Sequence, residues 1–182
     1  MYQADAFTSR LFAGNPAAVC PLEGWLPDHT MQSIAEENNL SETAFFVREK
    51  DNIYTLRWFT PVSEVDLCGH ATLATAHVMY NQLGYQLPEI HFETRSGRLT
   101  VYRMHDGYLM DFPNDPVRET ACPDMAGILG CELLFVGEGV TDFLVEVKDQ
   151  QTVESLKPDF RAMAALGGRG VIVTAPGENT DI

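Results

Sequence analysis

The sequence predicts an α+β fold in which a curled sheet of mixed or antiparallel strands surrounds one central, buried helix. Residues 70–83 (HATLATAHVMYNQL) are compatible with a helix and are apolar on nearly every face, which is typical of a helix enclosed within a domain. Short segments that alternate between apolar and polar residues precede and follow this helix, as strands of a half-buried sheet do. Gly84 is a natural end for the helix.

The other elements follow from period-two alternation and from turn residues. A second helix is expected to begin at Pro27-Asp28 and to end at Asn38-Asn39, because asparagine tolerates the left-handed conformation. Hairpin turns are expected at Ser96-Gly97 and Asp106-Gly107. The strands expected in this part of the chain are 2–7, 17–22, 43–48, 53–59, 89–94, 98–104 and 107–112.

Residues 111–116 (DFPNDP) have the composition of a linker, so we expect one domain at 1–112 and a second, incomplete one at 116–182. The elements expected beyond the linker are a helix near 123–129, strands near 132–136 and 140–147, a helical stretch near 151–166, a strand near 170–174 and a loop at 176–182.

Charge and composition exclude several classes of function. Twelve Lys+Arg against 26 Asp+Glu give a net charge of −14, which supplies no basic patch for nucleic acid or an anionic membrane. We see no signal peptide and no apolar run long enough to span a bilayer, so we expect a cytoplasmic protein. In that compartment, Cys20, Cys68, Cys122 and Cys131 are interpreted as thiols.

The first candidate site is Leu67–Thr72 (L-C-G-H-A-T), where a glycine opens the buried helix. Free backbone N–H groups at the positive end of the helix dipole can bind a carboxylate or a phosphate. A neutral His70 there can donate a hydrogen bond to a substrate or accept one. The alternative is that Gly69 forms a tight turn and that His70 is a half-buried structural residue.

The second candidate is Glu42, which stands immediately before the apolar strand that starts at Thr43. A partly buried carboxylate at this place suits proton transfer, although a lone glutamate at the start of a strand is more often exposed. Glu64 and Asp66 precede Gly69 and could be helix caps, metal ligands or solvated loop acids; we interpret them as loop acids. Cys68, His70 and His77 show no recognisable metal spacing, so we expect no metal. Cys68 could instead act as a nucleophile or as a proton-transfer thiol.

Four motifs in order resemble the phenazine biosynthesis-like (PhzF-like) family, which shares the diaminopimelate epimerase fold. They are D-A-F-T at Asp5–Thr8, G-N-P-A-A-V at Gly14–Val19, M-Q-x-I-A-x-E-x-N-L-S-E-T-A-F at Met31–Phe45 and R-W-F-T-P-x-x-E-V-D-L-C-G-H-A-T at Arg57–Thr72. The resemblance is dense over residues 1–85 and looser over 86–176.

This resemblance implies an isomerase or epimerase that transfers a proton on a small carboxylic acid without a metal or an organic cofactor. The proton-shuttling role falls on Glu42, with His70 lining the same site. Substrate binding falls on Gly69, Ala71 and Asn15. The resemblance also implies two similar domains, and we expect a homodimer.

One departure from the family leaves a second reading open. An E-D-P-x-T-G-S-A-like segment, which supplies the other wall of the family's active site, has no counterpart in residues 116–182, so the chain looks truncated. The alternative function is therefore a non-catalytic or partner-dependent module that lacks half of the active site. A further alternative uses Cys68 as the base, as related epimerases use thiols.

Overall fold

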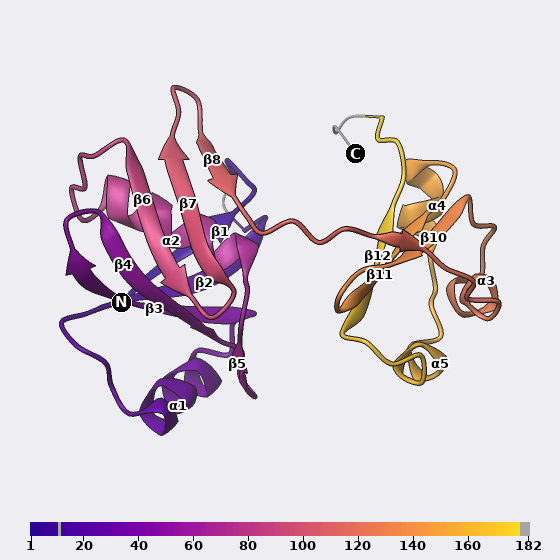
Figure 1. The fold of residues 1–182 in the computed structure, drawn as a ribbon, viewed down its shortest axis with the longest axis horizontal. Helices are drawn as coiled ribbons and strands as arrows, with labels where there is room; N and C mark the ends of the chain where they lie inside the picture. Colours follow the sequence, from indigo (N-terminus) through magenta and orange to yellow (C-terminus); the bar gives the residue numbers. More distant parts are fainter. Residues whose placement is uncertain (11, 179–182) are drawn as a thin grey trace. The chain divides into compact units, whose positions relative to one another are not determined.

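The computed structural model describes residues 1–10 and 12–178, which fall into two compact units (Figure 1). The first unit extends from Met1 to Pro113, and the second begins at Asn114. Among the described residues, the first unit contains an eight-stranded mixed sheet in the order β1-β2-β3-β4-β6-β7-β8, with β5 paired to β4. Its strands are β1 (Tyr2–Ala6), β2 (Asn15–Leu22), β3 (Glu42–Lys50), β4 (Ile53–Phe59), β5 (Glu64–Val65), β6 (Glu89–Thr94), β7 (Gly97–Arg103) and β8 (Tyr108–Asp111).

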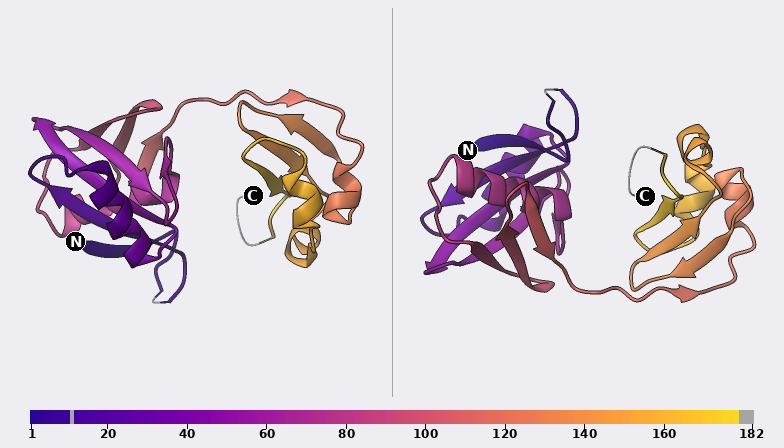
Figure 2. Two further views of the ribbon diagram at one scale, coloured as in Figure 1. Left: turned by 90° about the horizontal axis from the view of Figure 1, so that it is seen from below. Right: turned by 90° about the horizontal axis from the view of Figure 1, so that it is seen from above.

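Helix α2 (Gly69–Asn81) lies within the curl of this sheet, as the views in Figure 2 show, so the predicted central buried helix is confirmed. Its alanines and Val78 pack against strand residues such as Trp58, Phe92 and Leu99. Fully burying an aromatic or branched apolar side chain stabilises a fold by about 1.5–3 kcal/mol, and the cluster around α2 contains many such residues. The start of α2 is therefore held firmly.

Helix α1 (Asp28–Asn38) covers the opposite face of the sheet, where Met31 and Ala35 pack against Phe45 and Phe59. The expected end at Asn38-Asn39 is confirmed, because Asn39 adopts a left-handed φ of 49° and its N–H bonds the carbonyl of Ala35.

Strands β2 and β3 run parallel, with Ala17 opposite Glu42. Both strands therefore begin at the same edge of the sheet, which brings Asn15 and Glu42 to one end of the unit. Strand β5 was not predicted; it is a two-residue strand that forms a hairpin with β4.

The second unit contains, among its described residues, a four-stranded sheet in the order β12-β11-β10-β9. Its elements are β9 (Arg118–Glu119), α3 (Met125–Leu129), β10 (Phe135–Glu138), β11 (Asp142–Glu146), α4 (Gln150–Ser155), α5 (Phe160–Ala164) and β12 (Gly170–Thr174). Strand β9 was not predicted. Of the expected terminal loop, residues 179–182 lie outside the described part of the chain.

The prediction of one continuous helical stretch near 151–166 was wrong. The chain leaves the helix at Leu156, whose ψ is 139°, and a new helix begins after Asp159. Pro158 explains the break, because it has no backbone N–H to donate and disfavours a helical residue before it. Asp159 then caps α5 by accepting hydrogen bonds from the N–H groups of Arg161 and Ala162.

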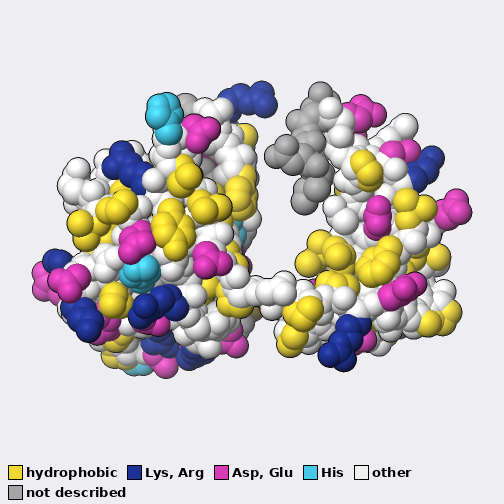
Figure 3. Space-filling model, turned by 45° about the horizontal axis from the view of Figure 1, so that its top comes forward, with side chains coloured by type: hydrophobic (Ala, Val, Ile, Leu, Met, Phe, Trp, Pro, Cys, Tyr) yellow, Lys and Arg dark blue, Asp and Glu magenta, His cyan; other side chains and the backbone are white. Residues whose placement is uncertain are grey.

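Acidic and basic side chains are interspersed on the face of the first unit that is visible in Figure 3. Within the described residues, no helix combines the length and the apolar character that crossing a membrane requires.

Candidate active site

Glu42 is the first residue of β3, and the strand pairing holds it at the edge of the sheet nearest the start of α2. The four residues after it are buried, because they form part of the core. The Glu42 side chain is 18% exposed, so the carboxylate is largely withdrawn from solvent. Glu42 is therefore not an exposed glutamate at the start of a strand, which was the alternative to a functional role.

His70 lies in the first turn of α2 and faces Glu42. Its Nε2 is 3.2 Å from Glu42 Oε2, and its side chain is 9% exposed. The geometry at this contact does not meet the conditions of a hydrogen bond, and both atoms are buried without a hydrogen-bond partner among the described residues. Buried polar atoms without partners are rare and are expected where a ligand completes the hydrogen bonding.

Cys68 completes the cluster, with its Sγ 3.4 Å from His70 Nδ1. Burial raises the pKa of the Cys68 thiol to about 12, against the opposing effect of the Ala71 N–H, and the Glu42 carboxylate raises it further. The sulfur is therefore a protonated thiol at neutral pH. This state disfavours the alternative in which Cys68 is the base, since that role needs a readily formed thiolate.

We expect iodoacetamide to alkylate Cys68 in the native protein about a hundredfold more slowly at pH 8 than in the urea-unfolded chain, because thiolate is the reactive form. Peptide mass spectrometry of timed samples resolves each cysteine. The half-buried Cys122 serves as the internal reference. Equal rates for native and unfolded Cys68 would contradict the raised pKa, and a faster native rate would indicate an activated thiol.

The backbone at the start of α2 has the features expected of an anion site. Gly69 and Ala71 belong to the first helical turn, whose N–H groups lack intrahelical acceptors. A Cβ placed on Gly69 would meet only the ring of Phe112 within reach, at 4.0 Å, so the space beside this glycine is open. Asn15 lies nearby, since its Oδ1 accepts a hydrogen bond of 3.2 Å from the hydroxyl of Ser41, the residue before Glu42.

Potential metal ligands also converge here: one atom each from Glu42, Cys68 and His70 lies within 4.8 Å of the others. Sequence spacing missed this cluster, because Glu42 arrives from a distant strand. Yet Glu42 contacts Nε2 of the histidine, whereas Cys68 contacts Nδ1. A ring nitrogen binds a metal along its own lone pair, so this arrangement does not aim all three residues at one ion. His77 lies apart, beside Asn81 and Tyr108.

A cavity of about 610 Å³ lies between β1, α2 and the turn before β8, but its lining contains none of the predicted site residues. The candidate site is therefore defined by the convergence of partnerless polar side chains at the start of α2.

A mixed sheet is curled around a buried helix, and a carboxylate and a histidine face each other at the N-terminus of that helix. This is an α+β fold whose site suits acid–base chemistry. The family model described as phenazine biosynthesis-like protein (PhzC-PhzF) matches residues 4–181. The chain belongs to this family, and both its fold class and its family were predicted correctly from the sequence.

Similar proteins from two bacteria carry names that indicate a class of reaction, isomerisation. A protein of Pseudomonas aeruginosa named as an uncharacterized isomerase is 51% identical over 185 residues, which cover 100% of this chain and 70% of that protein. Another of that name from Halalkalibacterium halodurans is 43% identical and covers 100% of this chain and 69% of that protein. The chain is thus an isomerase-type member of the family.

The crystal structure of a PhzF-family protein from Enterococcus faecalis superposes with a TM-score of 0.89 at 48% identity. The match covers 99% of this chain and 69% of that one.

Proposed function

We propose that this protein catalyses a cofactor-independent proton transfer on a small carboxylic acid, with Glu42 as the acid and base. The approach of Glu42 Oε2 to His70 Nε2, both buried and without hydrogen-bond partners among the described residues, carries the proposal. A carboxylate shielded from water and placed beside a histidine suits general acid–base catalysis. Membership in an isomerase-containing family supports it.

The reaction that fits this arrangement is a proton shift within one molecule. Glu42 removes a proton from a carbon of the substrate, and the electron pair of the broken C–H bond moves into the adjacent unsaturated system. The protonated carboxyl group exchanges its proton with solvent and then delivers a proton to another carbon, so the composition of the substrate is unchanged while solvent hydrogen enters it. Hydrogen bonds aimed at the charge that develops stabilise such a transition state.

The other residues hold the substrate in this proposal. The first-turn N–H groups of Gly69 and Ala71 bind the substrate carboxylate, because they lie at the positive end of the dipole of α2. His70 donates a hydrogen bond from Nε2 to a polar group of the substrate, and Asn15 contributes its amide at the rim. A homodimer and a cytoplasmic location stay predictions.

Incubating the full chain in D₂O with a panel of small unsaturated carboxylic acids tests the proposal by ¹H NMR. We expect at least one acid to gain deuterium at a carbon conjugated with its carboxylate when no metal or cofactor is added. An acid that perturbs the His70 ring resonances but exchanges no carbon-bound proton would contradict it. So would a conversion that proceeds only after a nucleotide or a metal is supplied.

A further inference from the structure

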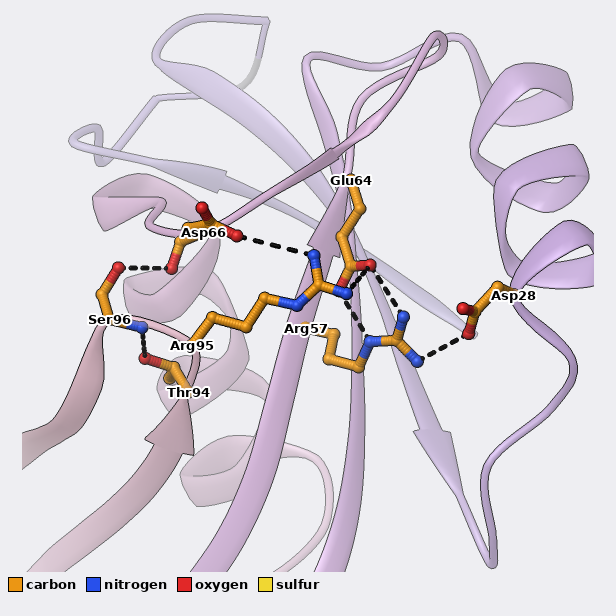
Figure 4. A network of polar contacts seen from close by, with 7 residues as sticks. All are labelled: Asp28, Arg57, Glu64, Asp66, Thr94, Arg95 and Ser96. Carbon is orange, nitrogen blue, oxygen red and sulfur yellow. Dashed lines mark hydrogen bonds and ion pairs between the residues drawn. The ribbon is translucent and has the colours of Figure 1, made fainter. Parts of the chain in front are cut away.

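A network of ion pairs joins residues that lie outside the candidate site (Figure 4). Its centre is Arg57 on β4, which donates two hydrogen bonds of 2.7 Å to the two carboxylate oxygens of Glu64 on β5. A third nitrogen of the same guanidinium contacts Oδ1 of Asp28 at 2.9 Å, at the start of α1. The interpretation of Glu64 as a solvated loop acid was therefore wrong: its side chain is only 12% exposed.

A second arginine holds the same short segment from the other side. Arg95 contacts Glu64 Oε2 at 2.6 Å and Asp66 Oδ1 at 3.5 Å. The hydroxyl of Ser96 donates a hydrogen bond of 2.8 Å to the backbone carbonyl of Asp66. Residues 64–66 are thus fixed to β4 on one side and to the β6–β7 turn on the other, immediately before Cys68 and His70.

The contacts of Arg57 differ from those of an ordinary surface ion pair. Its guanidinium carbon lies 5.3 Å from the ring centroid of Trp25 and 5.2 Å from that of Phe59. The hydrogen bonds to Glu64 raise the pKa of Arg57 above its ordinary value, although burial opposes this. A paired, two-pronged arginine–carboxylate contact that is partly buried fixes geometry, whereas exposed pairs contribute little.

We infer that Arg57 and Glu64 are positioning residues for the active site: they fix the segment from which Cys68, Gly69 and His70 enter α2, and so set the distance between His70 and Glu42. The inference rests on the proposed function in one respect: the distance between His70 and Glu42 affects catalysis only if these two residues form the active site. Glu64 and Asp66 connect the network to the start of α2 along the chain. On β4, Arg57 also lies opposite Phe45 of β3, the strand that begins with Glu42.

Three variants of the full chain test the inference: Arg57→Lys, which keeps the charge but loses the two-pronged contact, Glu64→Gln, and Arg95→Ala at a half-exposed position that does not endanger folding. The matched control is Arg98→Lys, because Arg98 pairs with Glu93 across the β6–β7 hairpin, in the same sheet but outside the network.

Hydrogen–deuterium exchange and histidine NMR give the readouts. We expect amide exchange in a peptide covering 66–73 to rise about tenfold in Arg57→Lys and Glu64→Gln, and less in Arg95→Ala, because hydrogen bonds to charged groups are lost. Exchange in β7 should stay unchanged. The ¹⁵N signals of the His70 ring should move, whereas those of His77, His91 and His105 should not.

Two outcomes would overturn the inference. One is exchange at 66–73 that rises no more than in Arg98→Lys. The other is an equal rise in β7, which indicates general destabilisation. Neither readout needs a substrate, so the inference can fail while Glu42-dependent proton transfer persists. Conversely, loss of the proposed function would leave these exchange results as they are.

Discussion

Replacing Gly14 with alanine is expected to destabilise the first unit by roughly 2–4 kcal/mol and to lower its melting temperature by roughly 10 °C. Gly14 has a φ of 78°, and an added Cβ would lie 2.3 Å from the carbonyl oxygen of Ala6 and 2.7 Å from Cγ2 of Thr8. The Ala6 oxygen belongs to the backbone of β1, so it cannot move aside without disturbing the β1–β2 pairing.

The matched control is Gly84→Ala. Gly84 has a similar φ of 71°, but nothing lies within 4 Å of its added Cβ. This variant isolates the cost of a left-handed alanine, about 1 kcal/mol. Thermal unfolding followed by circular dichroism measures both. Equal losses in the two variants would contradict the close contact at Gly14 and the tight turn that leads to Asn15.

Local patterns were enough to predict the elements around the site. The buried helix was predictable because residues 70–83 offer no polar face, and the start of β3 because an apolar run follows Glu42. The meeting of Glu42 with His70 was different, since it depends on the parallel pairing of β2 with β3 and on the path of α2 through the curl of the sheet. From the residues alone both were candidates, but each stood beside an alternative in which His70 is structural and Glu42 is exposed; the resemblance to a family decided between them.

Glu64 shows why some burial is invisible in a single sequence. Between Ser63 and Val65, and close to Asp66, it looked like a loop acid. The β4–β5 hairpin instead pairs it with Phe59 and brings it to the guanidinium of Arg57. An arginine inside an otherwise apolar strand, shortly before a glutamate, was the available signal. To predict the contact between Arg57 and Glu64 from this signal, one must know the register of the β4–β5 hairpin. Strand β5 has only two residues, which are too few to show an alternation of apolar and polar side chains.

Glu42→Gln is expected to slow proton transfer by about 10²–10⁴-fold, the range that general acid–base catalysis contributes. Glutamine has nearly the shape of glutamate and can still face His70, but it cannot accept and return a proton. Stability should change little, because Oε2 of Glu42 makes no hydrogen bond among the described residues that the change would remove. The melting temperature therefore separates a chemical effect from a structural one.

Glu49→Gln is the control for this change. Glu49 lies on the same strand β3 as Glu42, but it is exposed at the far end, where it accepts a hydrogen bond of 2.6 Å from the hydroxyl of Thr55. It bears the same charge and lies outside the site, so its variant should retain the wild-type exchange rate.

The most direct test of Glu42 as the acid and base is the rate of deuterium incorporation from D₂O into one carboxylic acid, measured for the wild type, Glu42→Gln and Glu49→Gln under identical conditions. We predict that incorporation falls at least about a hundredfold in Glu42→Gln and is unchanged in Glu49→Gln. Incorporation at the wild-type rate by folded Glu42→Gln protein would contradict the assignment.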